Sequence, residues 1–282
     1  MPRSRWDWNQ AKFDRFCKEK RGVGIRDQYT PWLTVRDFPS KGRVTRSSGW
    51  KTNRLHHLFS DHETRLFYIL EWSDSVIDIR EQYPLLDLDL AQKISADIGV
   101  KYPINTKSKF PNVLTTDFLA TVLQDGKTKD IALTVKPSSD LQKKRVIEKF
   151  EIERNYYAAK GIEWGLVTEK HIPKPLAKNI EWVHGAYRLE ENEENTIQDL
   201  YKIADALKLR LQSSNLKINQ VTSAVDVKFG LKEGLSLYLF RHLVACKEVI
   251  VDMHSSKRFP DMEAADIIKI QLSNDLGTSK TA

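Results

Sequence analysis

Two charged residues on neighbouring segments of the chain are the first candidates for chemistry. Asp117 lies in an apolar run, residues 115–122, and Lys136 closes a second run, residues 131–136. A polar turn around Gly126 joins the runs, which favours two adjacent strands of a hairpin. A lone charge on a buried strand is costly unless a counter-charge or a cation balances it. The pair, 136 − 117 = 19 residues apart, therefore predicts a hydrolytic metal site of the kind found in nucleases.

Each of these residues has an expected role and a plainer alternative. Asp117 is expected to bind the metal, although an acid facing solvent on an edge strand fits the same pattern. Lys136 is expected to orient or help deprotonate the attacking water, although a surface lysine before Pro137 fits equally. Many nucleases carry a glutamate two residues before this lysine, where this chain has Thr134. A hydroxyl is a weaker metal ligand, so we expect the Val135 carbonyl to supply a further oxygen.

Two glutamates are candidates for the missing acid. Glu63 precedes Phe67 by one helical turn, so it shares the helix face that packs on the sheet. The same residue fits the S-x-x-E capping box with Ser60, in which it only bonds back to the helix start. Glu153 lies four residues before Tyr157 on the apolar face of a later helix, where a bare carboxylate is costly. We expect Glu63 to bind the metal and Glu153 to support it, or else to pair with a basic neighbour on its helix.

Other chemistry has little support in the sequence. His56, His57 and His62 cluster near Glu63, but they lack the cysteines or the H-x-x-x-H spacing of a zinc motif, so we expect them at the surface or facing phosphate. The phosphate-binding pattern G-x-x-x-x-G-K-[ST] and the serine-hydrolase pattern G-x-S-x-G are both missing from the sequence. The only cysteines, Cys17 and Cys246, indicate neither a disulfide framework nor a zinc site.

Length and charge set the broader limits. A chain of 282 residues can hold one large core or two unequal domains. No apolar run is long enough to span a membrane and no secretory signal is evident, so we expect a cytosolic protein. The net charge is +7, and residues 1–60 hold 14 basic against 5 acidic residues, an excess of 9. Aromatic residues are interleaved with these charges, as expected either for a segment along a DNA backbone or for a solvated basic arm. They are Trp6, Trp8, Tyr29, Trp32 and Trp50.

The elements that must position the candidate residues follow a mixed order. Helices are predicted over 9–20, 60–72, 87–98 and 140–160, and strands over 76–83, 115–122, 131–136 and 164–168. This order predicts an α/β domain over residues 1–170, with a mixed sheet flanked by helices. Residues 171–282 are mostly helical to Cys246, and strands are predicted over 248–252 and 267–270, which is the order of a smaller winged-helix domain. The end, residues 277–282, is expected to fray.

The second domain offers a candidate DNA-binding face around a helix over 231–246 and the loop that follows it. Its basic residues are Lys228, Lys232, Arg241, Lys257 and Arg258. Over residues 215–271, however, 8 basic residues stand against 7 acidic ones. This balance favours docking of a protein at least as much as DNA binding.

Taken together, several motifs resemble the TnsA family, the endonuclease subunit of Tn7-like heteromeric transposases. They are dense between residues 29 and 184 and thin beyond. They include YTPWLTV at 29–35, RLHHL at 54–58, S-D-x-E at 60–63, LEW at 70–72, DIREQYPL at 78–85, TDF at 116–118, VKP at 135–137, EIER at 151–154 and NIEW at 179–182.

The resemblance implies a restriction-endonuclease-like N-terminal domain, a winged-helix-like C-terminal domain and Mg²⁺-dependent cutting of double-stranded DNA at the 5′ ends of a transposon. One or two Mg²⁺ ions are implied, with Mn²⁺ as a possible substitute. The family's catalytic glutamate, aspartate and lysine fall on Glu63, Asp117 and Lys136, a further functional glutamate on Glu153, and a glutamine position on Thr134. The implied partners are a TnsB-like transposase subunit, which cuts the 3′ strands, and a TnsC-like ATPase regulator.

Two alternatives stay open on the residues alone. The chain fits a non-catalytic subunit for DNA binding or assembly, and it fits a restriction or repair nuclease that acts without partners. The hydrolytic hypothesis depends on Glu63, Asp117 and Lys136 meeting at one pocket. A Glu63 side chain turned outward and bonded only to its own first turn would contradict it.

Overall fold

The computed structural model describes residues 8–37, 43–191 and 194–272. It divides the chain into two units, Met1–Ile172 and Pro173–Ala282, which are described separately. Trp6 and the end predicted to fray, residues 277–282, lie outside the described ranges. Among the helices in those ranges, none is long and apolar enough to cross a membrane.

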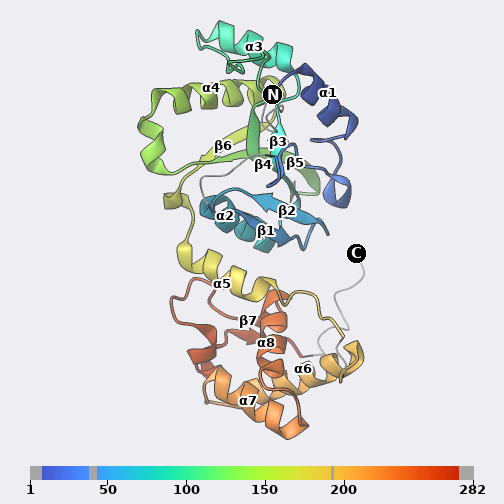
Figure 1. The fold of residues 1–282 in the computed structure, drawn as a ribbon. Coiled ribbons are helices and arrows are strands. Elements are labelled where there is room, and N and C mark those ends of the chain that lie inside the picture. The colour runs from blue at the N-terminus through green and yellow to red at the C-terminus, as the bar shows by residue number, and fades with distance from the viewer. Residues whose placement is uncertain (1–7, 38–42, 192–193, 273–282) are drawn as a thin grey trace. The chain divides into compact units, whose positions relative to one another are not determined.

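A four-stranded mixed sheet forms the centre of the first unit (Figure 1). Its order is β3-β4-β5-β6, in which β3, β4 and β5 pair antiparallel and β6 pairs parallel with β5. The strands are β3 (Val76–Pro84), β4 (Thr115–Gln124), β5 (Lys127–Val135) and β6 (Glu163–Val167). The predicted mixed sheet flanked by helices is confirmed.

The β4–β5 hairpin sets the register of the candidate residues. Its two-residue turn, Asp125 and Gly126, has positive φ at both positions, 50° and 73°, as the tight turns that match the strand twist require. The ladder pairs Phe118 with Leu133. Asp117 precedes Phe118 on β4, so it lies beside the C-terminal end of β5.

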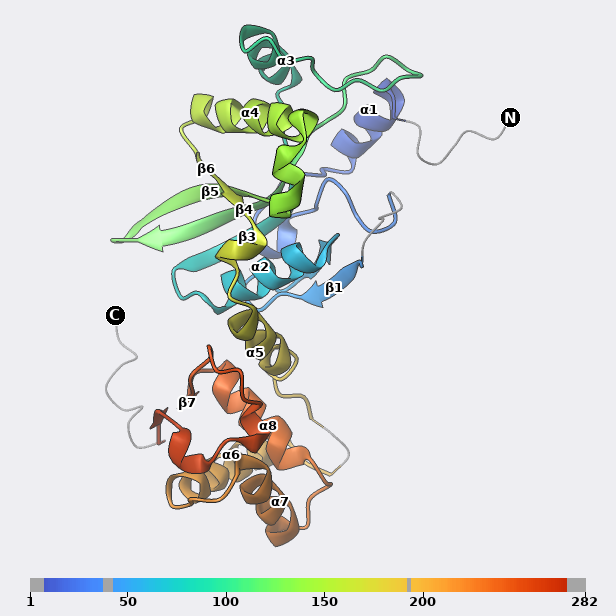
Figure 2. The same cartoon turned by 90° about the vertical axis from the view of Figure 1, so that its left-hand side faces the viewer.

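Helices cover both sides of this sheet (Figures 1 and 2). The helix α4 (Lys144–Ala159) packs against β6 and against α3 (Leu88–Asp97), and it buries Ile152 and Tyr157 in a core with Leu119 and Ala132. The helix α2 (Asp61–Trp72) packs against β3 from the other side and buries Leu66, Phe67 and Leu70. Burial of these apolar faces, rather than helix propensity, holds the helices in place.

One local prediction in this unit was wrong, and one pair of strands was missed. The helix predicted over 140–160 begins only at Lys144, because Lys143 has an extended backbone (φ −86°, ψ 110°) after a 3₁₀ turn, Ser138–Gln142. Glu169 accepts hydrogen bonds from the amide and hydroxyl of Ser138, which holds the start of this turn. The small antiparallel ladder β1 (Thr45–Ser48) and β2 (Leu55–Leu58) was not predicted, because the polar β1 has no alternating pattern.

Two aromatic residues of the basic segment, Tyr29 and Trp32, are part of the core rather than of a surface that could stack on DNA bases. Trp32 is 1% exposed, and Tyr29 is buried as well. Trp32 packs edge-on against Phe16 of α1 (Gln10–Lys18), with ring centroids 5.2 Å apart, and its ring lies 6.0 Å from that of Trp8. These rings therefore anchor α1 to the domain, and Trp32 and Tyr29 have no face free to stack on bases.

The second unit is mainly helical. Its helices are α5 (Lys174–His184), α6 (Ile197–Gln212), α7 (Ile218–Phe229) and α8 (Leu235–Ala245), followed by the paired strands β7 (Val249–Ile250) and β8 (Lys269–Ile270). Both strands are shorter than predicted, because the segment between them bonds elsewhere. Ile218 donates its amide hydrogen to the carbonyl of Met262, and Ala264 donates to that of Leu216. The winged-helix assignment therefore stays a prediction.

Candidate active site

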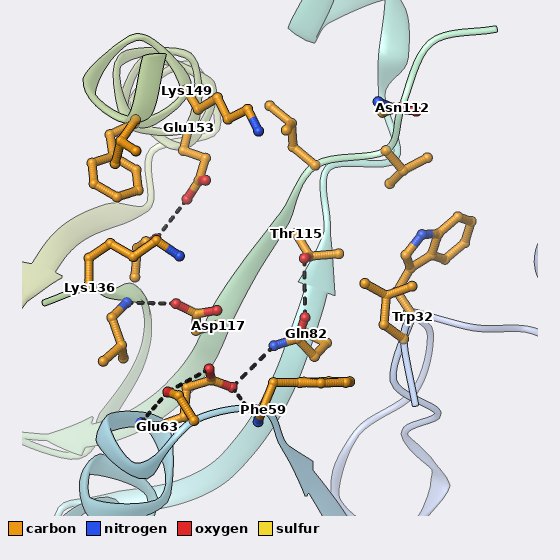
Figure 3. A pocket seen from close by; sticks show the side chains of 18 of the residues that line it. Trp32, Phe59, Glu63, Gln82, Asn112, Thr115, Asp117, Lys136, Lys149 and Glu153 are labelled. Carbon is orange, nitrogen blue, oxygen red and sulfur yellow. Dashed lines mark hydrogen bonds between the residues drawn. The ribbon is translucent and has the colours of Figure 1, made fainter. Parts of the chain in front are cut away.

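An open cleft of about 1050 Å³ in the first unit collects every candidate residue that the sequence assigned to catalysis or metal binding (Figure 3). Four separate elements supply them: α2, β4, the end of β5 and α4. The six residues are Glu63, Asp117, Thr134, Val135, Lys136 and Glu153. Residues up to 90 positions apart in sequence, 153 − 63, thus meet in one place.

Glu63 serves its own helix and faces the cleft at the same time. The Ser60 hydroxyl accepts a hydrogen bond from the Glu63 amide at 3.2 Å, and it donates one to Glu63 Oε1 at 2.9 Å. The other carboxylate oxygen accepts from the Phe59 amide at 2.9 Å and, at 3.4 Å, from the side-chain amide of Gln82 on β3. Glu63 is only 7% exposed. Its side chain is therefore not turned outward. The Ser60 side chain caps α2, but the Glu63 carboxylate bonds the Ser60 hydroxyl and the Phe59 amide instead of the Ser60 amide, so only half of the predicted capping box forms.

Asp117 is fixed by the neighbouring strand. Its Oδ2 accepts a hydrogen bond from the Val135 amide at 2.7 Å. Burial raises the pKa of Asp117, and the nearby Lys136 ammonium and this hydrogen bond offset the rise only in part. Figure 3 shows the Lys136 side chain ending beside Asp117, on the side towards Glu153. The contact of Val135 with Asp117 is through its amide; a metal contact through its carbonyl stays a prediction.

Glu153 lies at the end of a short chain of hydrogen bonds. Trp164 Nε1 donates to the Thr134 hydroxyl at 3.1 Å, and this hydroxyl donates to Glu153 Oε2 at 2.6 Å. Thr116 donates to the same oxygen at 3.4 Å. Thr134 and Glu153 are 3% and 5% exposed. The Thr134 hydroxyl thus donates its hydrogen bond to the Glu153 carboxylate, and its direct contribution is to hold Glu153 in position.

The cleft concentrates negative charge in a poorly solvated place. Burial first, and then the charge of Asp117, raises the pKa of Glu63 to about 8. Burial, together with the same Asp117 charge, raises the pKa of Glu153 to about 7 despite the hydrogen bond from Thr134. Carboxylates that resist ionisation in this way are stabilised by protons or by a cation.

The oxygen donors of the cleft fit a hard divalent cation that takes few of its ligands from the protein. In the described part of the chain, no three His, Cys, Asp or Glu residues are arranged to hold a metal ion. Mg²⁺ commonly binds through one or two carboxylates and completes its shell with water and substrate oxygens. Glu63 and Asp117 provide two such carboxylates.

Two further residues of the cleft were missed by the sequence analysis. Gln82 donates to Glu63, and its carbonyl oxygen accepts from the Thr115 hydroxyl at 3.2 Å. Its backbone has φ 49°, an uncommon value for a residue other than glycine, which marks local strain. Lys149 projects from α4 into the cleft next to Glu153 (Figure 3). Burial and the charges of Arg145 and Lys136 lower the pKa of Lys149.

The histidines are placed differently from the prediction. His56 is fully buried, where its Nδ1 lies 2.8 Å from Glu81 and its Nε2 lies 2.6 Å from the Thr52 hydroxyl. Arg54 completes this buried group with two contacts to Glu81, at 2.8 and 2.6 Å. His56 is therefore a core residue, and the expectation that it lies at the surface or faces phosphate was wrong. His62, in contrast, lines the cleft.

The basic residues proposed for DNA contact belong to the second unit, whereas the cleft belongs to the first. Arg241 donates from Nε to the carbonyl of Trp182 at 2.8 Å and stacks over its ring, so it joins α8 to α5. Lys257 pairs with Asp266 at 3.8 Å and Arg258 with Asp261 at 3.6 Å. Lys228 and Lys232 are exposed at and after the end of α7. DNA contact by these residues stays a prediction.

Comparison with known proteins identifies the family. The model described as TnsA-like endonuclease N terminal matches residues 73–169, and the model described as TnsA endonuclease C terminal matches residues 171–253. The chain is also 36% identical over 274 residues to the transposon Tn7 transposition protein TnsA of Escherichia coli, an alignment that covers 97% of each chain. This alignment is longer than the two model matches together and spans nearly the whole chain. The chain therefore belongs to the TnsA family of transposition endonucleases.

Proposed function

We propose that this chain is the Mg²⁺-dependent endonuclease subunit of a heteromeric transposase and that it hydrolyses phosphodiester bonds of double-stranded DNA at the 5′ ends of a transposon. One observation carries the proposal: Glu63, Asp117, Lys136 and Glu153 converge on one cleft from separate elements. Membership of an endonuclease family supplies the reaction class, cleavage of phosphodiester bonds.

Mg²⁺ would be held by Glu63, Asp117 and the carbonyl of Val135, with Thr134 in a supporting position. When bound, the ion polarises the scissile phosphate and stabilises the leaving oxygen. Mn²⁺ is expected to substitute, because it accepts the same carboxylate and carbonyl ligands. The buried carboxylates and their raised pKa values support this assignment, since a divalent cation would relieve their repulsion.

The residues of the chain divide the remaining work. Lys136 holds the attacking water and neutralises charge that develops on the phosphate. Glu153, with a pKa of about 7, is suited to accept a proton from that water near neutral pH. Thr134 and Trp164 keep the carboxylate of Glu153 in position through their hydrogen bonds.

Membership of the TnsA family supports the choice of partners. We propose that the DNA substrate is a transposon end and that a TnsB-like transposase subunit and a TnsC-like ATPase regulator act with this chain in the bacterial cytosol. Residues 1–170 are assigned to catalysis. Residues 171–282, with their nearly balanced charge, are assigned to a winged-helix-like domain that docks a partner or contacts DNA.

The test is a nicking assay on plasmid DNA that carries transposon ends, with Mg²⁺ or with EDTA. Lys136→Ala is expected to abolish cleavage and leave partner binding intact. Lys129→Ala is the matched control, because Lys129 lies on β5, the strand that Lys136 directly follows, but is exposed. Full nicking by Lys136→Ala, or equal nicking in EDTA, would contradict the mechanism.

The same assay separates the alternatives when it is run with and without the transposase partner. Cleavage only in its presence supports the proposal. Cleavage by the chain alone at any sequence would favour a restriction or repair nuclease. A complete lack of cleavage in both conditions would favour an assembly subunit.

A further inference from the structure

A second cavity in the first unit is lined mainly by basic side chains. It measures about 540 Å³ and lies beside the β1–β2 ladder. Its basic residues are Arg21, Arg36, Arg46 and His57, and its one acid is Asp37. Nothing in the proposed mechanism uses this cavity.

The acid of this cavity is already satisfied. Asp37 Oδ2 accepts hydrogen bonds from Arg21 at 2.7 Å and from the amide and hydroxyl of Thr34 at 2.8 and 2.6 Å. These hydrogen bonds, from Thr34 first and then Arg21, lower the pKa of Asp37 although burial opposes them. Arg21 and Asp37 therefore neutralise one another, and the positive charge at the opposite wall is not balanced by this acid.

That opposite wall consists of Arg46 and His57, which pair across the two strands. Arg46 is exposed, and His57 is half-buried. In the part of the chain that the structure describes, the buried Nδ1 of His57 has no hydrogen-bond partner. Burial lowers the pKa of His57, and the positive charges of Arg46 and Arg54 add to this effect, although Glu81 opposes them. An anion in the cavity would give this nitrogen a partner and compensate Arg46.

We propose that this cavity binds a phosphate of the DNA backbone, through Arg46 and His57, where the strand runs on from the active-site cleft. Asp37 lines both cavities, so the two are adjacent. Among the described residues that line this cavity, the imidazole of His57 is the one aromatic ring, which favours a backbone phosphate over a nucleotide with its base. The inference rests on the proposed function, because it requires DNA in the cleft.

The first test measures duplex binding by the full chain in EDTA, with the transposase partner present in one series. Arg46→Gln is expected to weaken binding about three- to tenfold, equally for transposon-end and unrelated sequences, and to reduce the slope of log K against log salt by about 1. Arg154→Gln is the matched control, because Arg154 is exposed on α4 and pairs with Glu151 at the surface. It is expected to change neither affinity nor slope.

The second test follows the His57 ring by NMR titration in the same protein. Duplex DNA is expected to raise the pKa of His57, because a phosphate stabilises the imidazolium. Inorganic phosphate at the same phosphate concentration is expected to have a much smaller effect. If inorganic phosphate alone raises this pKa, the site takes free phosphate and the inference is overturned.

The outcomes separate this inference from the proposed function. Unchanged affinity and slope in Arg46→Gln, in a protein that still binds and nicks DNA, would overturn the phosphate site and leave the nuclease assignment standing. A wild-type chain that binds no duplex in either series would overturn both.

Discussion

The substitution Glu153→Gln is expected to stabilise the metal-free protein above neutral pH while it impairs cleavage. An exposed glutamate has a pKa of 4.5, and burial raises that of Glu153 to about 7. Between these values the folded state keeps a proton that the unfolded state has lost. The free energy of unfolding must therefore fall as the pH rises through this window, and the whole penalty is present above pH 7.

The magnitude follows from the two pKa values. Each pKa unit corresponds to about 1.4 kcal/mol, so a rise from 4.5 to about 7 costs about 3 kcal/mol in the ionised state. Little of this is lost to solvent screening, because Glu153 is only 5% exposed. Glutamine does not ionise, and its carbonyl oxygen can still accept the hydrogen bond from Thr134. The variant should therefore gain up to about 3 kcal/mol above pH 7 and nothing near pH 4.5.

The measurement is urea unfolding in EDTA at several pH values from 4.5 to 8. Glu151→Gln serves as the control, because Glu151 lies two residues earlier on α4, has a side chain that is 42% exposed and pairs with Arg154. The comparison uses differences between each variant and the wild type, so that groups common to all three proteins do not decide the result. A difference between Glu153→Gln and wild type that does not change with pH, or a destabilised variant at pH 8, would refute the reasoning.

Three further predictions concern neighbouring residues. Thr134→Val removes the hydroxyl that lowers the pKa of Glu153, so the acidic limb of the pH–rate profile should move to higher pH. If Thr134 instead binds the metal, the variant should need a higher metal concentration for cleavage. Glu63→Gln should remove most of the thermal stabilisation that Mg²⁺ gives the wild type at pH 8, measured without DNA. Gln82→Ala should lower the free energy of unfolding by about 1–3 kcal/mol in chemical denaturation, because it leaves buried polar partners unsatisfied and keeps a positive φ. An unchanged denaturation midpoint would count against a stabilising role for the contacts of Gln82 with Glu63 and Thr115.

Local pattern was enough to predict the sheet and the identity of most residues at the site. The runs around Asp117 and Lys136 carry their own turn, and a two-residue turn fixes the register of the hairpin. Glu153 was found because a carboxylate on an apolar helix face is costly wherever that helix packs. These inferences needed only spacing and the cost of burying charge.

The residues that were missed or misplaced depend on contacts between distant segments. Gln82 enters the cleft from a strained point of β3, where its backbone carbonyl accepts a hydrogen bond from the amide of Trp32. Trp32 was grouped with the basic residues around it as part of a DNA-binding or solvated segment. Its burial against Phe16 depends instead on where α1 packs on the domain. His56 is buried because Glu81, 25 residues later, is beside it. Spacing within one segment contains none of this information.

The Glu63 result shows why two interpretations of one motif need not compete. Only half of the capping box forms: the Ser60 hydroxyl accepts from the Glu63 amide, whereas the Glu63 carboxylate accepts from the Ser60 hydroxyl and the Phe59 amide instead of the Ser60 amide. In this fold the Phe59 amide and Gln82 draw one carboxylate oxygen towards β3. The cap thus restricts the first turn of α2 and helps to hold an acid whose charge is costly in the cleft. A substitution at Ser60 should therefore reduce cleavage as well as helix stability, whereas an ordinary capping residue would affect stability alone.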